Sequence, residues 1–281
     1  MAYHETTITA ADGLALFVRI WTPEMAPRGV VLIVHGLGEH AGRYPHLVRA
    51  LLEHGYLVFG PDQRGCGRSE GRRGDFRAFD DVLNDLDRVV SATREQYPGL
   101  PLFLYAHSLG AMYATHYLSR HEEDITAAVL SAPGYGPGPD LSAANIRLAY
   151  LLARIVPGLY LRSKASDDFR LSHDPEAKRA YDEDTLRIEK FTVRFAVTNL
   201  QKATEAQRLL ATLRLPILVL LPADDTTINR QAVLNAVAQA GPNVILRTYP
   251  GWHELHNELP ALRQPVFDEV LAWLAMVRSN G

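Results

Sequence analysis

Short apolar runs alternate with helical segments along most of the chain. Val30–Val34 and Ile217–Leu221 are continuous runs of branched aliphatic residues, as expected for strands buried on both faces of a parallel sheet. Over Asp80–Gln96, by contrast, the hydrophobic residues recur at helical spacing. This alternation predicts an α/β fold in which a mostly parallel sheet is flanked by helices. Further strands are expected at Leu14–Ile20, Leu57–Gly60, Leu102–Ala106, Ala128–Ser131 and Val244–Tyr249, and further helices at Tyr44–His54, Leu109–Ser119, Asn229–Ala240 and Arg263–Arg278.

The alternation is interrupted in the middle of the chain. Pro133–Pro139 holds three glycines and three prolines and predicts a loop, and from Leu141 to Leu213 the pattern is helical with no clear strand. We therefore expect a first core part at 1–133, an inserted helical cap or lid at 134–213, and a second core part at 214–281. A cap at this point would lie over the carboxyl ends of the strands, where open α/β sheets bind ligands.

Composition and charge narrow the classes of protein. The 281 residues carry 29 Lys and Arg against 32 Asp and Glu, a near balance that argues against nucleic acid as the main partner. The single cysteine, Cys66, excludes an intrachain disulfide and suits a reducing compartment. Met1–Asp12 does not have the pattern of a signal peptide, and the longest apolar stretch, Leu148–Leu161, is interrupted by polar and helix-breaking residues. We expect a cytoplasmic protein that contacts membrane surfaces without crossing them.

Two serines lie in a small-x-Ser-x-Gly pattern, which marks the strand-to-helix turn of a nucleophilic serine. Ser108 follows the predicted strand Leu102–Ala106 and precedes a predicted helix, as such a turn requires. Ser69 lies in a polar, glycine-rich loop before Arg72, where no helix begins, and is interpreted as a loop hydroxyl. Ser108 is therefore the candidate nucleophile, although a serine in its position also serves as an ordinary helix N-cap.

His35-Gly36-Leu37-Gly38 directly follows the strand Val30–Val34. In this type of fold, one donor of the oxyanion hole comes from that loop and the other from the residue after the nucleophile. We therefore expect the backbone N–H groups of Leu37 and Leu109 to stabilise a developing oxyanion.

The partners of the serine follow from chain order, which is Ser, then Asp or Glu, then His. His253 comes first after the Pro250-Gly251 turn and is the favoured base; His256 is the alternative. Asp224 and Asp225 follow the strand Ile217–Leu221, and Asp224 is favoured as the acid, with Asp225 left open. The histidine spacing and the lone cysteine match no common zinc motif, and the third glycine of a dinucleotide fingerprint is missing. We expect neither a metal nor another cofactor.

With these motifs, the chain resembles the monoacylglycerol lipase and lysophospholipase branch of the α/β-hydrolases almost from end to end. The resemblance rests on His35–Tyr44, Asp62–Gly71, His107–Gly110, Ala223-Asp224 and His253–Glu258. It implies the α/β-hydrolase fold with a helical cap at 134–213. It also implies that Ser108, Asp224 and His253 form a catalytic triad, and that Leu37 and Leu109 supply the oxyanion amides.

The cap segment Ile146–Leu161 has more apolar residues than one packed stripe of a helix requires. It packs on the core, or it lines an acyl pocket and contacts a membrane surface. The sequence therefore predicts a serine hydrolase that cleaves small acyl esters, with monoacylglycerols as the expected substrates. A short-chain carboxylesterase or a peptidase with the same triad is the alternative, and a non-catalytic binding protein of this fold is the alternative from another class.

Overall fold

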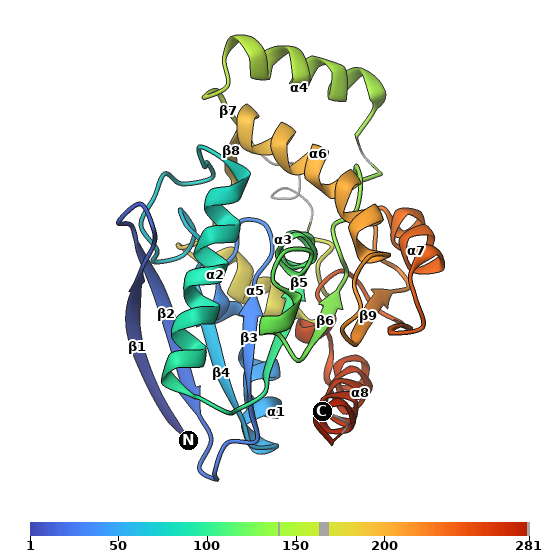
Figure 1. The fold of residues 1–281 in the computed structure, drawn as a ribbon. Coiled ribbons are helices and arrows are strands. Elements are labelled where there is room, and N and C mark those ends of the chain that lie inside the picture. The colour runs from blue at the N-terminus through green and yellow to red at the C-terminus, as the bar shows by residue number, and fades with distance from the viewer. Residues whose placement is uncertain (140, 163–168, 280–281) are drawn as a thin grey trace.

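A mostly parallel sheet of eight strands runs through the molecule, in the order β1-β2-β4-β3-β5-β6-β9-β10 (Figure 1). The computed structural model describes residues 1–139, 141–162 and 169–279. β2 pairs antiparallel with both β1 and β4, and the remaining neighbours are parallel. The strands are β1 (Ala2–Thr9), β2 (Ala15–Thr22), β3 (Gly29–Val34), β4 (Tyr56–Pro61), β5 (Leu102–His107), β6 (Ala127–Ser131), β9 (Ile217–Pro222) and β10 (Val244–Tyr249).

The central strands are buried on both faces, as their apolar runs predict. Every residue of β3, β4, β5 and β9 is buried. In β3, Val30, Leu32 and Val34 pack into one hydrophobic core, whereas Val31 and Ile33 pack into a second core on the opposite face. Fully burying one such side chain contributes about 1.5–3 kcal/mol, so the sheet has a strong reason to be covered on both sides.

Helices cover both faces of the sheet. Those with residues in the first core are α2 (Phe79–Gln96), α3 (Leu109–Leu118), α6 (Val193–Leu210) and α7 (Arg230–Gln239). Those that belong to the second core are α1 (Pro45–Glu53) and α8 (Pro260–Ser279). None of the helices among the described residues is both long and apolar enough to cross a membrane.

Between β6 and β9 the chain leaves the sheet. Figure 1 shows α6 above the strands and α4 outermost, above α6. The elements of this segment are α4 (Ala143–Ile155), β7 (Tyr160–Arg162), α5 (Pro175–Glu183), β8 (Lys190–Thr192) and α6 (Val193–Leu210). The prediction that this segment has no strand is wrong, because β7 and β8 pair antiparallel. Strands of three residues are too short to show a hydrophobic period, so the pattern does not reveal them.

Candidate active site

Ser108 lies on the turn that joins β5 to α3. Its backbone φ of +52° is in the left-handed region, which is uncommon for a residue with a side chain and costs about 1–3 kcal/mol. Its N–H donates to the carbonyl of Ser131 over 2.9 Å. The turn is tight: a methyl group on Gly110 would lie 2.1 Å from the carbonyl oxygen of Val34. Only a glycine fits at position 110, which explains the small residue that the motif has there.

The second serine motif has a different surrounding. Ser69 is buried in the loop after β4, where its hydroxyl donates to the carbonyl of Asp62 over 2.5 Å and accepts from the N–H of Phe17 over 2.8 Å. Both hydrogen bonds join this loop to neighbouring backbone. The Ser69 hydroxyl thus holds the loop against β2, as expected for a structural serine.

Histidine and carboxylate side chains form one line with Ser108. Nε2 of His253 lies 2.9 Å from Oγ of Ser108, and Nδ1 of His253 lies 2.7 Å from Oδ2 of Asp225. Oδ1 of Asp225 accepts from the N–H groups of Thr227 and Ile228, which fixes the carboxylate in place. This arrangement has the geometry of a Ser-His-Asp triad.

The prediction of Asp224 as the acid is wrong in position. Asp224 is exposed, and among the described residues its carboxylate accepts a hydrogen bond only from the N–H of Gly251, over 3.3 Å. Its neighbour Asp225 is buried and faces His253. The chain turns at Ala223 and Asp224, and the Asp225 carboxylate is fixed by the N–H groups of Thr227 and Ile228, so Asp225 and not Asp224 faces the imidazole.

Burial and the neighbouring charges have opposite effects on the pKa values of His253 and Asp225. Burial alone would lower the pKa of His253, but the charge and hydrogen bond of Asp225 outweigh it and the pKa is raised. Burial would likewise raise the pKa of Asp225, but His253 and the two backbone donors hold it below its usual range. Asp225 is therefore a carboxylate at neutral pH, and it stabilises the protonated form of His253.

The loop after β3 lies directly beside Ser108. A methyl group on Gly36 would lie 3.3 Å from Cβ of Ser108, so the Gly36–Leu37 peptide borders the serine. Leu109 is the first residue of α3, next to Ser108 in the chain. The structure thus brings both predicted oxyanion residues, Leu37 and Leu109, next to Ser108. The N-terminus of α3 also presents its positive dipole end at this point.

Two side chains fix the Gly36 backbone. The N–H of Gly36 donates to Glu39, and Nδ1 of His35 lies 3.0 Å from the carbonyl of Gly36. Nε2 of His35 accepts from the N–H of Gln63 over 2.9 Å, so Nδ1 carries the proton and donates to that carbonyl. Burial lowers the pKa of His35, which keeps it neutral. Because the peptide is planar, fixing the Gly36 carbonyl also fixes the direction of the Leu37 N–H.

A second group of buried polar residues lies beside the triad, and the sequence predictions assign it no role as a group. His256, considered there as the alternative base, is buried and stacks on Tyr44 with 4.3 Å between ring centroids. Burial and the neighbouring His107 lower the pKa of His256 to about 3, so it is neutral. Arg43 and Glu254, which lie in the motifs His35–Tyr44 and His253–Glu258, could have indicated this group, because charged residues are seldom buried without a partner.

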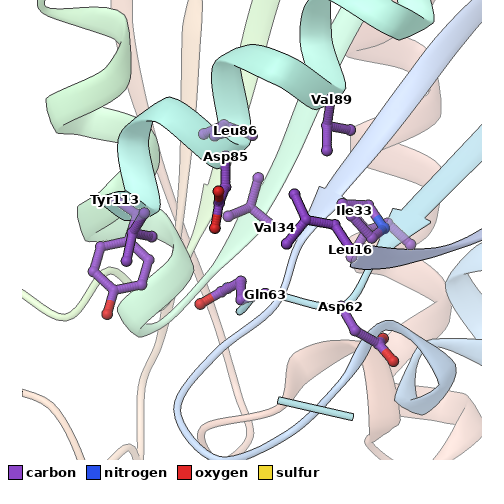
Figure 2. Close-up of a pocket in the computed structure, with 11 residues that line it drawn as sticks. Leu16, Ile33, Val34, Asp62, Gln63, Asp85, Leu86, Val89 and Tyr113 are labelled. Atoms are coloured by element: carbon purple, nitrogen blue, oxygen red, sulfur yellow. The ribbon is translucent and has the colours of Figure 1, made fainter. Parts of the chain in front are cut away.

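A small cavity of about 30 Å³ lies between β3 and α2 (Figure 2). It is lined mainly by apolar residues of β3 and α2, with Gln63, Asp85 and Tyr113 among the polar ones. None of Ser108, Asp225 and His253 lines it. Pockets for small-molecule ligands usually measure about 300–1,000 Å³, so this cavity is too small for an acyl chain.

Comparison with known proteins places this geometry in a family. The family model described as serine aminopeptidase, S33, matches residues 25–260. The chain belongs to this family. It is 30% identical over 275 residues to the monoacylglycerol lipase of Mycolicibacterium smegmatis, with 96% of each chain covered. It is 32% identical over 272 residues to human monoglyceride lipase, covering 94% of this chain and 88% of the human one.

The fold agrees with this membership in the S33 family. A soluble variant of monoglyceride lipase from Saccharomyces cerevisiae superimposes with a TM-score of 0.85 at 22% identity, covering 97% of this chain and 96% of the yeast one. At that identity the likeness shows the fold alone. The predicted α/β-hydrolase fold and the predicted family are confirmed, and the chain is a hydrolase.

Proposed function

We propose that the protein hydrolyses carboxylic esters, and monoacylglycerols in particular, to a fatty acid and an alcohol. The observation that carries this proposal is the hydrogen-bonded line from Ser108 through His253 to Asp225, with 2.9 Å and 2.7 Å between the paired atoms. A hydroxyl in contact with the imidazole of a buried histidine–carboxylate pair is the arrangement that activates serine as a nucleophile.

The reaction proceeds in two halves. Ser108 Oγ attacks the ester carbonyl carbon while Nε2 of His253 takes the hydroxyl proton. The C–O bond to the alcohol then breaks, and His253 returns the proton to the leaving alcohol oxygen. Water attacks the acyl-enzyme in the same way, with His253 as base, and releases the fatty acid and the free Ser108 hydroxyl. Asp225 keeps the imidazole in the tautomer that accepts the serine proton and stabilises its charged form.

The oxyanion of each tetrahedral intermediate is assigned to the backbone N–H groups of Leu37 and Leu109. Their loops border Ser108, the carbonyl of the Gly36–Leu37 peptide is held by His35, and the N–H of the preceding peptide is held by Glu39. Preorganised donors need no rearrangement when charge develops, and losing one such donor typically costs about 10²–10³ in turnover.

The inserted segment 134–213 is proposed to act as the cap of this site. It bonds to the loops on both sides of Ser108: the N–H of Ile188 donates to the carbonyl of Gly38, and the N–H of Glu254 donates to the carbonyl of Leu171. A cap in this position is suited to enclose the acyl chain, where each buried CH₂ adds about 0.8 kcal/mol of binding. Monoacylglycerol as substrate rests on the two lipases of M. smegmatis and human that resemble this chain over nearly their whole length.

Helix α4 supports a contact with membranes. Leu148, Leu151 and Ile155 are exposed on one face of this helix, together with Arg147 and Arg154. Figure 1 shows α4 on the outside of the molecule, above α6. An exposed apolar face flanked by cations fits the boundary between lipid headgroups and acyl chains. We propose a cytoplasmic enzyme that binds membrane surfaces transiently through this face.

A series of glycerol monoesters and p-nitrophenyl esters with acyl chains of increasing length tests the function. The proposal predicts that kcat/KM rises from acetyl to medium and long chains, because longer chains bury more surface. A sharp optimum at acetyl would favour a short-chain esterase instead. Cleavage of aminoacyl amides in preference to esters would favour a peptidase, as the family description suggests. If neither esters nor amides are hydrolysed, the result would favour a non-catalytic binding protein.

A further inference from the structure

A buried charged cluster connects the two loops that flank Ser108. It consists of Glu39, Arg43, Glu254 and Asn257, and is called here the Arg43 bridge. Nη2 of Arg43 donates to both carboxylate oxygens of Glu254, over 2.9 and 3.0 Å. The amide of Asn257 donates to Glu254 over 2.7 Å and to the carbonyl of Arg43 over 3.1 Å. Arg43 and Glu254 are 211 residues apart in sequence, so these bonds join otherwise separate parts of the chain.

At one end, the bridge reaches the proposed oxyanion loop. Nε of Arg43 lies 3.4 Å from Oε2 of Glu39. The other oxygen of Glu39 accepts from the N–H of Gly36 and from the hydroxyl of Tyr44. Glu39 therefore holds the His35–Gly36 peptide, which is joined through Gly36 to the peptide that carries the Leu37 N–H.

At the other end, the bridge reaches the proposed base. Glu254 directly follows His253 in the chain and is almost completely buried. A shift of the Glu254 side chain therefore moves the backbone that carries the imidazole. Effects on reaction geometry are large, because a displacement of about 1 Å can cost about 10²-fold in rate.

Stability alone gives a weak reason for such a cluster. A buried ion pair must overcome the cost of removing both charges from water, and replacing it by apolar residues is often neutral or stabilising. Here the side chains of Glu39 and Glu254 both lie against the guanidinium of Arg43. The hydrogen bonds of an ion pair have a fixed geometry, whereas an apolar contact does not. An ion pair can therefore fix the position of one loop relative to another.

We propose that Arg43 and Glu254 are positioning residues that fix the Leu37 amide and the His253 imidazole relative to each other, on either side of Ser108. This inference rests on the proposed function, because it concerns the geometry of the same active site.

The chain offers a matched control pair. Arg64 bonds both oxygens of Asp85 over 2.6 and 2.7 Å, also joining a loop after a strand to another element. The side chains of Arg64 and Asp85 are each 9% exposed, against 7% for Arg43 and 4% for Glu254. Among the described residues, the side chains of Arg64 and Asp85 make no hydrogen bond or ion pair with either of the loops that flank Ser108.

The experiment compares Arg43→Met, Arg43→Lys, Glu254→Gln and the double variant Arg43→Met/Glu254→Gln with Arg64→Met. We expect Arg43→Met to lower kcat about 10- to 100-fold with a smaller change in KM, since the loss is one of reaction geometry. Arg43→Lys restores part of kcat, because an ammonium can still reach Glu254. The double variant loses less than the product of the two single losses, because each single change already breaks the same bond. Arg64→Met lowers the melting temperature without lowering kcat.

The pH profile separates positioning from loss of fold. Asp225, His107, Glu254 and Glu39 are the charged or titratable groups around His253, and the negative charge of Glu254 is one of the influences that raise its pKa. Glu254→Gln removes that charge, so the acidic limb of the kcat/KM profile moves to lower pH. A merely destabilised enzyme keeps the position of that limb.

Hydrogen–deuterium exchange supplies a readout that does not depend on activity. Arg43→Met should increase exchange in 35–44 and 250–258 together, and Arg64→Met should not. If the wild-type protein cleaves no ester, but Arg43→Met still increases exchange in both loops together, the proposed function is wrong and the positioning role of the Arg43 bridge is supported. Equal losses of kcat in Arg43→Met and Arg64→Met would overturn the bridge, as would fully multiplicative losses in the double variant. If Arg43→Met does not fold, Arg43→Lys and Glu254→Gln provide the same comparison.

Discussion

Replacing Asp225 by Asn tests the triad at the point where sequence and structure disagree. The asparagine side chain can keep the contacts of Oδ1 with the N–H groups of Thr227 and Ile228, so its other end, now an NH₂ group, faces Nδ1 of His253. Because an NH₂ group only donates, Nδ1 must become the acceptor and the ring proton moves to Nε2. Nε2 lies 2.9 Å from Oγ of Ser108 and in that tautomer cannot take the serine proton.

The magnitude follows from this change of tautomer. Losing the correct tautomer in a Ser-His-Asp triad lowers kcat about 10⁴-fold, or about 5 kcal/mol of transition-state stabilisation. Asp224→Asn is the control, since that carboxylate is exposed and accepts the N–H of Gly251 over 3.3 Å. The asparagine oxygen can still accept that N–H, so kcat should stay within about fivefold of wild type, the limit for an exposed hydrogen bond worth about 1 kcal/mol or less.

The assay is steady-state hydrolysis of a p-nitrophenyl ester, with melting temperatures for both variants. Asp225→Asn should remain folded, because the replacement has the same shape and keeps two of its backbone contacts. The reasoning would be refuted if Asp224→Asn lost as much kcat as Asp225→Asn. It would also be refuted if folded Asp225→Asn retained wild-type turnover, because the bond of 2.7 Å to His253 would then have no catalytic role.

Three further predictions concern the serine, the pH profile and the outer helix. A fluorophosphonate probe should label Ser108, and Ser108→Ala should abolish both labelling and turnover in a folded protein; labelling at Ser69 would reverse the assignment. The raised pKa of His253 should place the acidic limb of kcat/KM above pH 6.5, the ordinary histidine value, because only neutral imidazole accepts the serine proton. Leu151→Asp should weaken sedimentation with vesicles that contain anionic lipid while hydrolysis of a water-soluble ester is kept; unchanged sedimentation would exclude the α4 face as the contact.

Much of the fold could be predicted because burial leaves a clear pattern in the sequence. β3 and β9 are apolar throughout and lie in the middle of the sheet, where both faces are covered. β1 escaped prediction, since it is an edge strand with exposed side chains and few apolar positions. Its partner β2, not its own hydrophobic pattern, determines that it is a strand.

In the candidate site, the nucleophile could be predicted from the sequence but the acid could not. Ser108 could be separated from Ser69 because a strand-to-helix turn needs a strand before it and a helix after it, and both leave periodic patterns. Asp224 and Asp225 could not be separated in this way. Both follow β9 directly, and the direction of each side chain depends on the turn that Thr227 and Ile228 close over Asp225. That turn depends on tertiary packing, which leaves no period in the sequence.

The unusual backbone at Ser108 shows why small residues, rather than the triad letters alone, mark this site. A φ of +52° is unfavourable by itself, so the surrounding structure must hold it. Ser108 is bonded to Ser131, and Gly36, Gly110 and Gly134 approach within distances at which a methyl group would press on Ser108 or on the strand β3 beside it. Enlarging Gly110 should therefore force the turn to relax, because the Val34 carbonyl is backbone and cannot move aside. Gly110→Val should lower kcat and the melting temperature together, and a variant that lost only stability would show that this turn does not hold the nucleophile.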